Sequence, residues 1–223
     1  MLRVGLTGGL GSGKSMAARR FAELGAVVFS SDDIGREMMQ PGEPVYTAIV
    51  AHFGPGVVSS DGTLDRSALA RVAFGGGEQG SGRVEELNAI VHPAVIARQN
   101  ELMDEVAAHD PQAVAIVESA LIFETWFGGG WRKRFDRLIF VKATEELRIA
   151  RFVVRAAGRK TLNEEERQAL QAEARRRIAR QSETERNAVH CDFVLTNNGS
   201  IDQLLVQVDA LWPVLKDAAK QRS

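Results

Sequence analysis

The chain has 223 residues, of which 44% are hydrophobic and 26% charged, and its formal net charge is −1. This composition is typical of a globular protein with a sizeable core, and the balanced charge gives no reason to expect binding to nucleic acid or to a membrane surface. The single cysteine, Cys191, excludes an internal disulfide bond and a multi-cysteine metal site, and we expect a cytoplasmic protein that is a monomer or a weak homo-oligomer.

The start of the chain predicts a strand, a loop, a helix and a second strand. Residues 2–9 indicate a buried strand that runs into a loop, and residues 14–26 indicate a helix that ends at Gly25. Residues 27–33 indicate a second buried strand that ends in polar residues. This order within a short segment is typical of the βαβ unit of a parallel sheet.

The loop of this unit, GGLGSGKS at residues 8–15, matches every fixed position of the pattern G-x-x-x-x-G-K-[ST]. Glycines let successive backbone N–H groups approach phosphate oxygens, and the following helix directs its positive end at the same anion. Lys14 can reach the β- and γ-phosphates of a nucleoside triphosphate, and the Ser15 hydroxyl can ligate Mg²⁺. The motif predicts triphosphate binding without separating kinases from GTPases or motor ATPases.

The second predicted strand ends with two aspartates, Asp32 and Asp33. Ligands of open parallel sheets bind at the carboxyl ends of strands. A carboxylate there can take the proton of an acceptor hydroxyl during phosphoryl transfer, or it can cap the next helix. We expect one aspartate in each role and favour Asp32 as the base.

Residues 34–110 change to helical segments broken by turns, which indicates a helical insertion between strands of the sheet. Its last segment contains Pro93, where we expect a new helix to begin. The glycine-rich stretch at residues 75–82 indicates a surface loop. His92 precedes that proline and is either a structural histidine at a helix boundary or a residue of a substrate pocket.

Strand patterns return at residues 113–123, 136–143 and 191–198, and an amphipathic helix is predicted over residues 201–219. A charged helical block lies between the last two strands, at residues 145–187.

Within this block, Arg151 and Arg155 are four residues apart and share one helix face. Such a face can stabilise charge on the γ-phosphoryl oxygens and close as a lid, or it can be a solvated face with ion pairs. For Arg175–Arg177 the solvated face is favoured.

The sequence resembles the dephospho-CoA kinases, P-loop kinases that phosphorylate the ribose 3′-hydroxyl of dephospho-CoA. The family opens with LTGGIGSGKS, close to residues 6–15 here, and its second strand typically ends D-A-D-x-I-A-R, where this chain has SSDDIGR. Ser30 replaces the first acid of that motif, and Met16 stands where the family usually has Thr. The resemblance extends over nearly the whole chain, through residues 40–54, 61–74, 87–95, 118–125 and 191–204.

The resemblance implies ATP with Mg²⁺ and dephospho-CoA as the small-molecule partners, with no nucleic acid and no membrane. The catalytic residues that it implies are Asp32, Lys14 and Arg151. The ATP-binding residues that it implies are Gly8, Gly9, Leu10, Gly11, Ser12, Gly13, Lys14, Ser15, Met16, Arg155 and Asn197. The substrate-binding residues that it implies are Asp32, Arg36, His92 and Glu124, and the metal ligand is the Ser15 hydroxyl. Gln181 and Asn198 also match family positions.

The fold expected from the motif and the resemblance is the three-layer α/β fold of P-loop nucleoside-triphosphate hydrolases, with a parallel sheet, a helical substrate-binding insertion and a helical lid. We assign residues 1–33, 111–150 and 188–223 to the nucleotide-binding core, residues 34–110 to a CoA-substrate-binding insertion and residues 151–187 to the lid.

Two alternatives remain open. Another P-loop kinase of small metabolites or nucleoside monophosphates would share the phosphate loop. A nucleotide-operated switch of the GTPase kind should carry an N-K-x-D motif, and the sequence has none.

Overall fold

The computed structural model describes residues 1–75, 82–123, 130–181 and 185–222. In these ranges no helix is both long enough and apolar enough to cross a bilayer.

The chain forms two compact units. One comprises Met1–Phe29 and Met103–Ser223, and the other comprises Ser30–Leu102. Each unit has its own cluster of buried apolar side chains. One boundary lies in the last residues of strand β2 (Val27–Ser30), and the other lies within helix α5 (Val84–His109).

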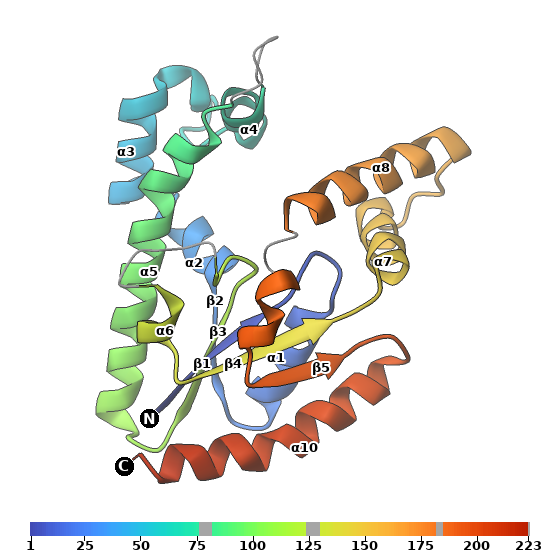
Figure 1. Cartoon of the computed structure of the whole chain (residues 1–223). Helices are drawn as coiled ribbons and strands as arrows, with labels where there is room; N and C mark the ends of the chain where they lie inside the picture. Colours follow the sequence, from blue (N-terminus) through green and yellow to red (C-terminus); the bar gives the residue numbers. More distant parts are fainter. Residues whose placement is uncertain (76–81, 124–129, 182–184, 223) are drawn as a thin grey trace. The chain divides into compact units, whose positions relative to one another are not determined.

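The first unit contains a five-stranded sheet with the order β2-β3-β1-β4-β5 (Figure 1). β1 (Leu2–Thr7) pairs in parallel with β3 (Val114–Glu118) and with β4 (Arg137–Lys142). β4 also pairs in parallel with β5 (Phe193–Thr196). Because β1 is the central strand, its carboxyl end delivers the glycine loop to the middle of the sheet's carboxyl edge.

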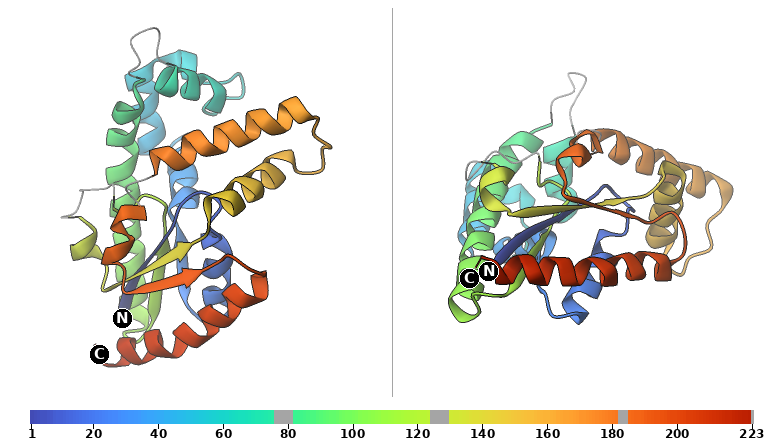
Figure 2. Two further views of the ribbon diagram at one scale, coloured as in Figure 1. Left: turned by 45° about the vertical axis from the view of Figure 1, so that its right-hand side comes forward. Right: turned by 60° about the horizontal axis from the view of Figure 1, so that its bottom comes forward.

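Alternate residues of the strands pack on opposite faces of this sheet. Leu2, Val4 and Leu6 of β1 belong to a core cluster with side chains of α1 (Lys14–Glu23) and α10 (Ile201–Lys220). Figure 2 shows α10 running along that face. On the other face, Ala115 and Val117 of β3 pack with Met103 of α5. The predicted α/β fold with a parallel sheet between helical layers is therefore confirmed.

The charged block between β4 and β5 forms a helical hairpin (Figure 1). α7 (Glu145–Ala157) turns back into α8 (Glu164–Arg180), which starts at a capping box made by Asn163 and Glu166. Apolar residues of both helices form one cluster, and Leu10 of the glycine loop packs against it. Short helices among the described residues of this unit include α6 (Trp131–Arg134) and the 3₁₀ helix η3 (Asn187–His190).

The second unit is helical. Its elements before α5 are α2 (Ser31–Met38), α3 (Pro44–Phe53), the 3₁₀ helix η1 (Pro55–Val57) and α4 (Arg66–Phe74). Its core consists of the buried side chains Val45, Ile49, Val57 and Leu69, with partly buried residues of α5 packed against them.

Helix α5 is continuous through Pro93, so the prediction that a new helix begins there is wrong. Proline removes one backbone donor, and packing on both sides can offset that loss. Val91 and Ala94 both pack on the core of the unit, so the same apolar face continues across Pro93.

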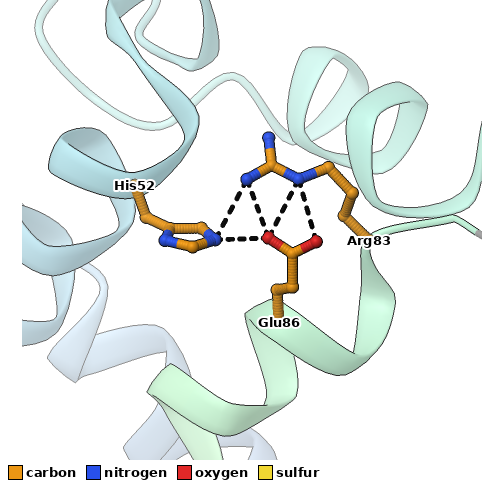
Figure 3. A network of polar contacts seen from close by, with 3 residues as sticks. All are labelled: His52, Arg83 and Glu86. Carbon is orange, nitrogen blue, oxygen red and sulfur yellow. Dashed lines mark hydrogen bonds and ion pairs between the residues drawn. The ribbon is translucent and has the colours of Figure 1, made fainter.

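A polar network joins α3 to the start of α5 (Figure 3). Arg83 donates to both carboxylate oxygens of Glu86, at 2.8 Å from Nη2 to Oε2 and 3.1 Å from Nε to Oε1. His52 contacts the same carboxylate through Nε2, and the Arg83 guanidinium lies over the Phe53 ring, 4.5 Å from its centroid. This network therefore links the end of α3 to the start of α5, on either side of the segment that contains the predicted glycine-rich loop. Residues 76–81 of that loop lie outside the described part of the chain.

Candidate active site

The glycine loop adopts a backbone that other residues would strain. Gly8, Gly11 and Gly13 have φ of 150°, 71° and 102°, in the range that favours glycine. Space is short as well, because a Cβ on Gly11 would lie 2.6 Å from the carbonyl oxygen of Arg148. Gly13 is also the N-cap of α1, so the loop leads directly into the positive end of that helix. Such a loop can surround a phosphate group with backbone N–H donors.

A hydroxyl, an ammonium and a carboxylate meet at the start of α1. Ser15 Oγ donates to Glu118 Oε1 at 3.0 Å, and Lys14 Nζ lies 4.0 Å from the same oxygen. Glu118 was missed in the sequence, because the strand predicted over residues 113–123 runs past it, whereas β3 ends at Glu118 itself. An acid at the end of a strand beside β1 would have been the signal.

This group fits a magnesium ion. Ser15 and Glu118 supply two oxygen donors 3.0 Å apart, and Mg²⁺ binds proteins through one or two such ligands, with waters and substrate phosphates completing its shell. Among the described residues no three His, Cys, Asp or Glu side chains come together as a metal site. The described residues therefore offer a partial shell that a triphosphate would complete.

Arg151 and Asn197 support the loop from the side. Asn197, only 6% exposed, donates from Nδ2 to the carbonyl of Ser12 at 2.8 Å. Arg151 Nη2 donates to the backbone carbonyl of Asn197 at 3.0 Å and to its Oδ1 at 3.2 Å. Arg155 is exposed one turn further along α7 and has no hydrogen bond within the described ranges. The structure thus brings Arg151 and Asn197 to the loop and leaves Arg155 outside this group.

Met16 contributes to the core. Its side chain packs against the apolar cluster beneath the sheet, and its backbone N–H donates to the carbonyl of Gly13 at 3.0 Å. Both groups hold the first turn of α1 in place. An ATP contact of Met16 stays a prediction.

In the helical unit, Ser30 is the N-cap of α2, since its hydroxyl accepts from the backbone N–H of Asp33 at 3.2 Å. The prediction that one of the two aspartates caps this helix is therefore wrong. A serine directly before the first helical residue supplies the cap oxygen. The Asp33 carboxylate pairs with Arg36 instead. Asp32 is exposed and has no hydrogen bond or ion pair among the residues that the structure describes.

The turn that carries Asp32 is fixed on α5. Gln99, only 2% exposed, donates from Nε2 to Ser31 Oγ at 2.8 Å. A Cβ on Gly35 would meet Val95 at 3.7 Å, so α2 and α5 lie within ordinary contact distance at this point. Gln99 carries no signal in the sequence, because nothing local relates it to Ser31.

The other predicted substrate residues are less defined. His92 is half-buried on α5, and burial lowers the pKa of its imidazole, which favours the neutral form. Arg36 is exposed and pairs with Asp33. Glu124 lies outside the described residues. Substrate contacts of all three stay predictions.

Comparisons with known proteins agree with this geometry. A family model described as dephospho-CoA kinase matches residues 2–203. The chain is 39% identical over 212 residues to the dephospho-CoA kinase of Corynebacterium jeikeium, covering 95% of this chain and 98% of the relative. It is 35% identical over 217 residues to that of Leifsonia xyli, covering 97% and 100%.

Solved structures show the same fold. A crystal structure of a Thermus thermophilus protein superposes with a TM-score of 0.69 at 28% identity and covers 96% of this chain and 97% of its own. The dephospho-CoA kinase of Campylobacter jejuni superposes with a TM-score of 0.59 at 19% identity, covering 96% of both chains. At 19% identity, the Campylobacter jejuni structure is evidence for the fold alone.

Proposed function

Because the chain belongs to the dephospho-CoA kinase family, we propose that it transfers the γ-phosphoryl group of ATP to the ribose 3′-hydroxyl of dephospho-CoA, the last step of coenzyme A synthesis. The observation that carries this proposal is the glycine loop with Lys14 and Ser15 grouped around Glu118. A loop of this shape suits a triphosphate, and family membership supplies the acceptor.

The first unit would bind ATP. Backbone N–H groups of the loop and the N-terminus of α1 would surround the β-phosphate, and Lys14 would neutralise charge between the β- and γ-phosphates. Mg²⁺ held by Ser15, Glu118 and the phosphates would supply charge stabilisation when it is bound. Arg151 lies beside the loop and would stabilise the transferring group, because charge on its equatorial oxygens is spread in the transition state.

Asp32 would act as the general base. Its carboxylate accepts the proton of the 3′-hydroxyl as that oxygen bonds to the γ-phosphorus and the bond to the β–γ bridging oxygen breaks, which releases ADP. The exposed carboxylate of Asp32, without a partner among the described residues, supports this role. Asp33 is less suited, because its carboxylate is paired with Arg36.

Dephospho-CoA would be bound by Arg36, His92 and Glu124 in addition to Asp32. A neutral His92 can donate one hydrogen bond and accept another, which suits a polar uncharged part of the substrate. Arg155 and the α7–α8 hairpin would close over the phosphates and exclude water, which would otherwise hydrolyse ATP. A monomeric or weakly oligomeric state and a cytoplasmic location remain predictions.

The test is an assay of the purified chain with ATP, Mg²⁺ and dephospho-CoA. We expect a product heavier than dephospho-CoA by one phosphate, with phosphorus–proton NMR coupling at the ribose 3′ position, and no product when a chelator removes Mg²⁺. A panel of nucleoside monophosphates and small alcohols should give little transfer. Faster transfer to a panel member than to dephospho-CoA would contradict the proposal, and so would ATP hydrolysis without any acceptor preference.

A further inference from the structure

Leu10, in the glycine loop, is held from both ends of the α7–α8 hairpin. Its backbone carbonyl accepts from Arg148 Nε at 2.8 Å, near the start of α7. Its backbone N–H donates to Gln181 Oε1 at 2.8 Å, directly after α8. Its side chain packs against the apolar cluster between the two helices. The hairpin therefore determines where this part of the phosphate loop lies.

Arg148 is an unusual residue for such a contact. Its side chain is only 3% exposed, and burial lowers the pKa of its guanidinium, although arginine stays charged at neutral pH. Nη1 pairs with Glu185, while Nη2 is buried without a hydrogen-bond partner among the described residues. An apolar side chain could fill this position without the desolvation of a charge. The retained charge therefore points to a task beyond packing.

The fit between Arg148 and the loop is close on two sides. A Cβ on Gly11 would lie 2.6 Å from the carbonyl oxygen of Arg148, and the guanidinium occupies the space in which a side chain on Gly9 would stand. Next to this contact is a cavity of about 190 Å³, lined in part by Gly9, Ser12, Arg148 and Glu185. Packing beside this cavity is therefore incomplete, and the directed contacts of Arg148 add to the packing of Leu10 in holding the loop.

We propose that Arg148 is a positioning residue for ATP, which fixes the backbone of Leu10 and so keeps the phosphate loop in the shape that binds the triphosphate. This inference rests on the proposed function for the identity of the nucleotide. It assigns to the first turns of α7 a role in binding, whereas the predicted lid begins only at residue 151. The acceptor should be unaffected, because within the described ranges the hydrogen bonds and the ion pair of the Arg148 side chain go to the loop and to Glu185.

The experiment compares three variants of the full chain. Arg148→Met removes the charge and the hydrogen bond at similar length, and Arg148→Lys keeps the charge with a single donor group. Arg175→Met is the control, on the exposed surface of α8 and without a hydrogen bond in the described ranges. Calorimetric titration with ATP and Mg²⁺, in the absence of any acceptor, gives the dissociation constants, and thermal unfolding without nucleotide gives the stabilities.

Arg148→Met removes a hydrogen bond made by a charged group. From the usual free energy of such a bond we expect the variant to bind ATP roughly tenfold to a hundredfold more weakly. Arg148→Lys should lie between it and the wild type, and Arg175→Met should equal the wild type. In steady-state assays KM for ATP should rise while KM for dephospho-CoA stays unchanged.

A merely structural role would lower the unfolding temperature of Arg148→Met and leave ATP affinity within about twofold of the wild type, and that result would overturn the inference. Should Arg148→Met fail to fold, Arg148→Lys decides, because unchanged ATP affinity in that variant would also overturn it. A wild-type chain that binds ATP but transfers nothing to dephospho-CoA would contradict the proposed function and leave this inference standing.

Discussion

The two units use polar side chains in different ways. Around the phosphate loop, the buried side chains of Asn197 and Arg148 donate to backbone carbonyls. In the helical unit, His52, Arg83 and Glu86 contact one another, and each side chain is more than 40% exposed, at 42%, 41% and 43%.

The buried contacts fix the backbone of the loop at defined places, whereas the exposed contacts only link two helices. A buried donor bound to a carbonyl fixes the backbone at one place, and its removal leaves a buried group unsatisfied. Exposed charged pairs contribute little, are screened by salt and respond to pH. Removal of a buried contact that shapes the loop should therefore cost more stability than removal of a contact in the exposed network of the helical unit. Two residues of that unit are exceptions: the buried Gln99 fixes the turn that carries Asp32, and Asp32 itself has a proposed chemical task.

The largest effect is therefore expected for Asp32→Asn. Loss of the general base should lower kcat by about 10²–10⁴-fold, and affinity for ATP should be nearly unchanged, because no contact of Asp32 with the phosphate loop is proposed. Rapid-quench or coupled assays give kcat, and calorimetry gives ATP affinity. Asp33→Asn is a matched control from the same helical turn and should keep most of the activity. Equal losses in the two variants would remove Asp32 from the mechanism.

The next largest effect is expected for Lys14, which lies in the phosphate loop. Lys14→Ala should lower kcat/KM for ATP by roughly 10²–10³-fold, because a positive charge that acts on the phosphates in both ground and transition states is lost. Unlike Asp32→Asn, it should weaken ATP binding and turnover together. Lys160→Ala, an exposed lysine paired with Glu166, is the control. A Lys14→Ala enzyme with wild-type ATP affinity would show that the loop does not bind the triphosphate as proposed.

A pair of glycines tests how much close packing matters at the loop. Gly13 and Gly42 have similar φ of 102° and 95°, but a Cβ on Gly13 would overlap the Asn197 amide, whereas a Cβ on Gly42 meets nothing within 4 Å. Gly42→Ala should destabilise by about 1–2 kcal/mol through backbone strain alone. Gly13→Ala should lose more stability and also lose ATP affinity. Thermal unfolding measures the stabilities and nucleotide titration the ATP affinities. Equal losses of stability in the two variants would show that the Asn197 side chain moves aside at little cost.

The parts of the molecule that follow from neighbouring residues could be predicted from the sequence. The glycine loop needs only consecutive residues to define its backbone, and β1 and α1 follow from local apolar patterns. The second predicted strand was too long, because β2 ends at Ser30 and residues 31–33 begin α2. The same local reasoning was wrong at Pro93, where packing of α5 on both sides keeps the helix continuous. It was also wrong at the α2 cap, where Ser30 was considered only as a missing acid.

Three supporting residues, Arg148, Glu118 and Gln99, could not be predicted, because their partners are distant in the sequence. Arg148 binds Leu10 across 138 positions, and Ser15 binds Glu118 across 103. In the sequence, Arg148 is one of many arginines in a charged block, and nothing in its neighbourhood separates it from the exposed ones. Only the arrangement of α7 against the loop gives it a role.

The smallest effect is expected for Glu86→Gln in the exposed network. Hydrogen bonds from Arg83 and His52 lower the pKa of Glu86 from 4.5 to about 2, so the carboxylate stabilises the folded state fully above pH 4.5 and loses this effect as the pH falls towards 2. The unfolding temperatures of wild type and variant should therefore differ by a small amount above about pH 5, and this difference should shrink as the pH falls from about 4.5 towards 2. Glu85→Gln, which removes a neighbouring exposed charge without a hydrogen bond in the described ranges, should show no such convergence. A wild-type advantage that persists at pH 2, or that added salt leaves unchanged, would mean that the network does more than fasten α3 to α5.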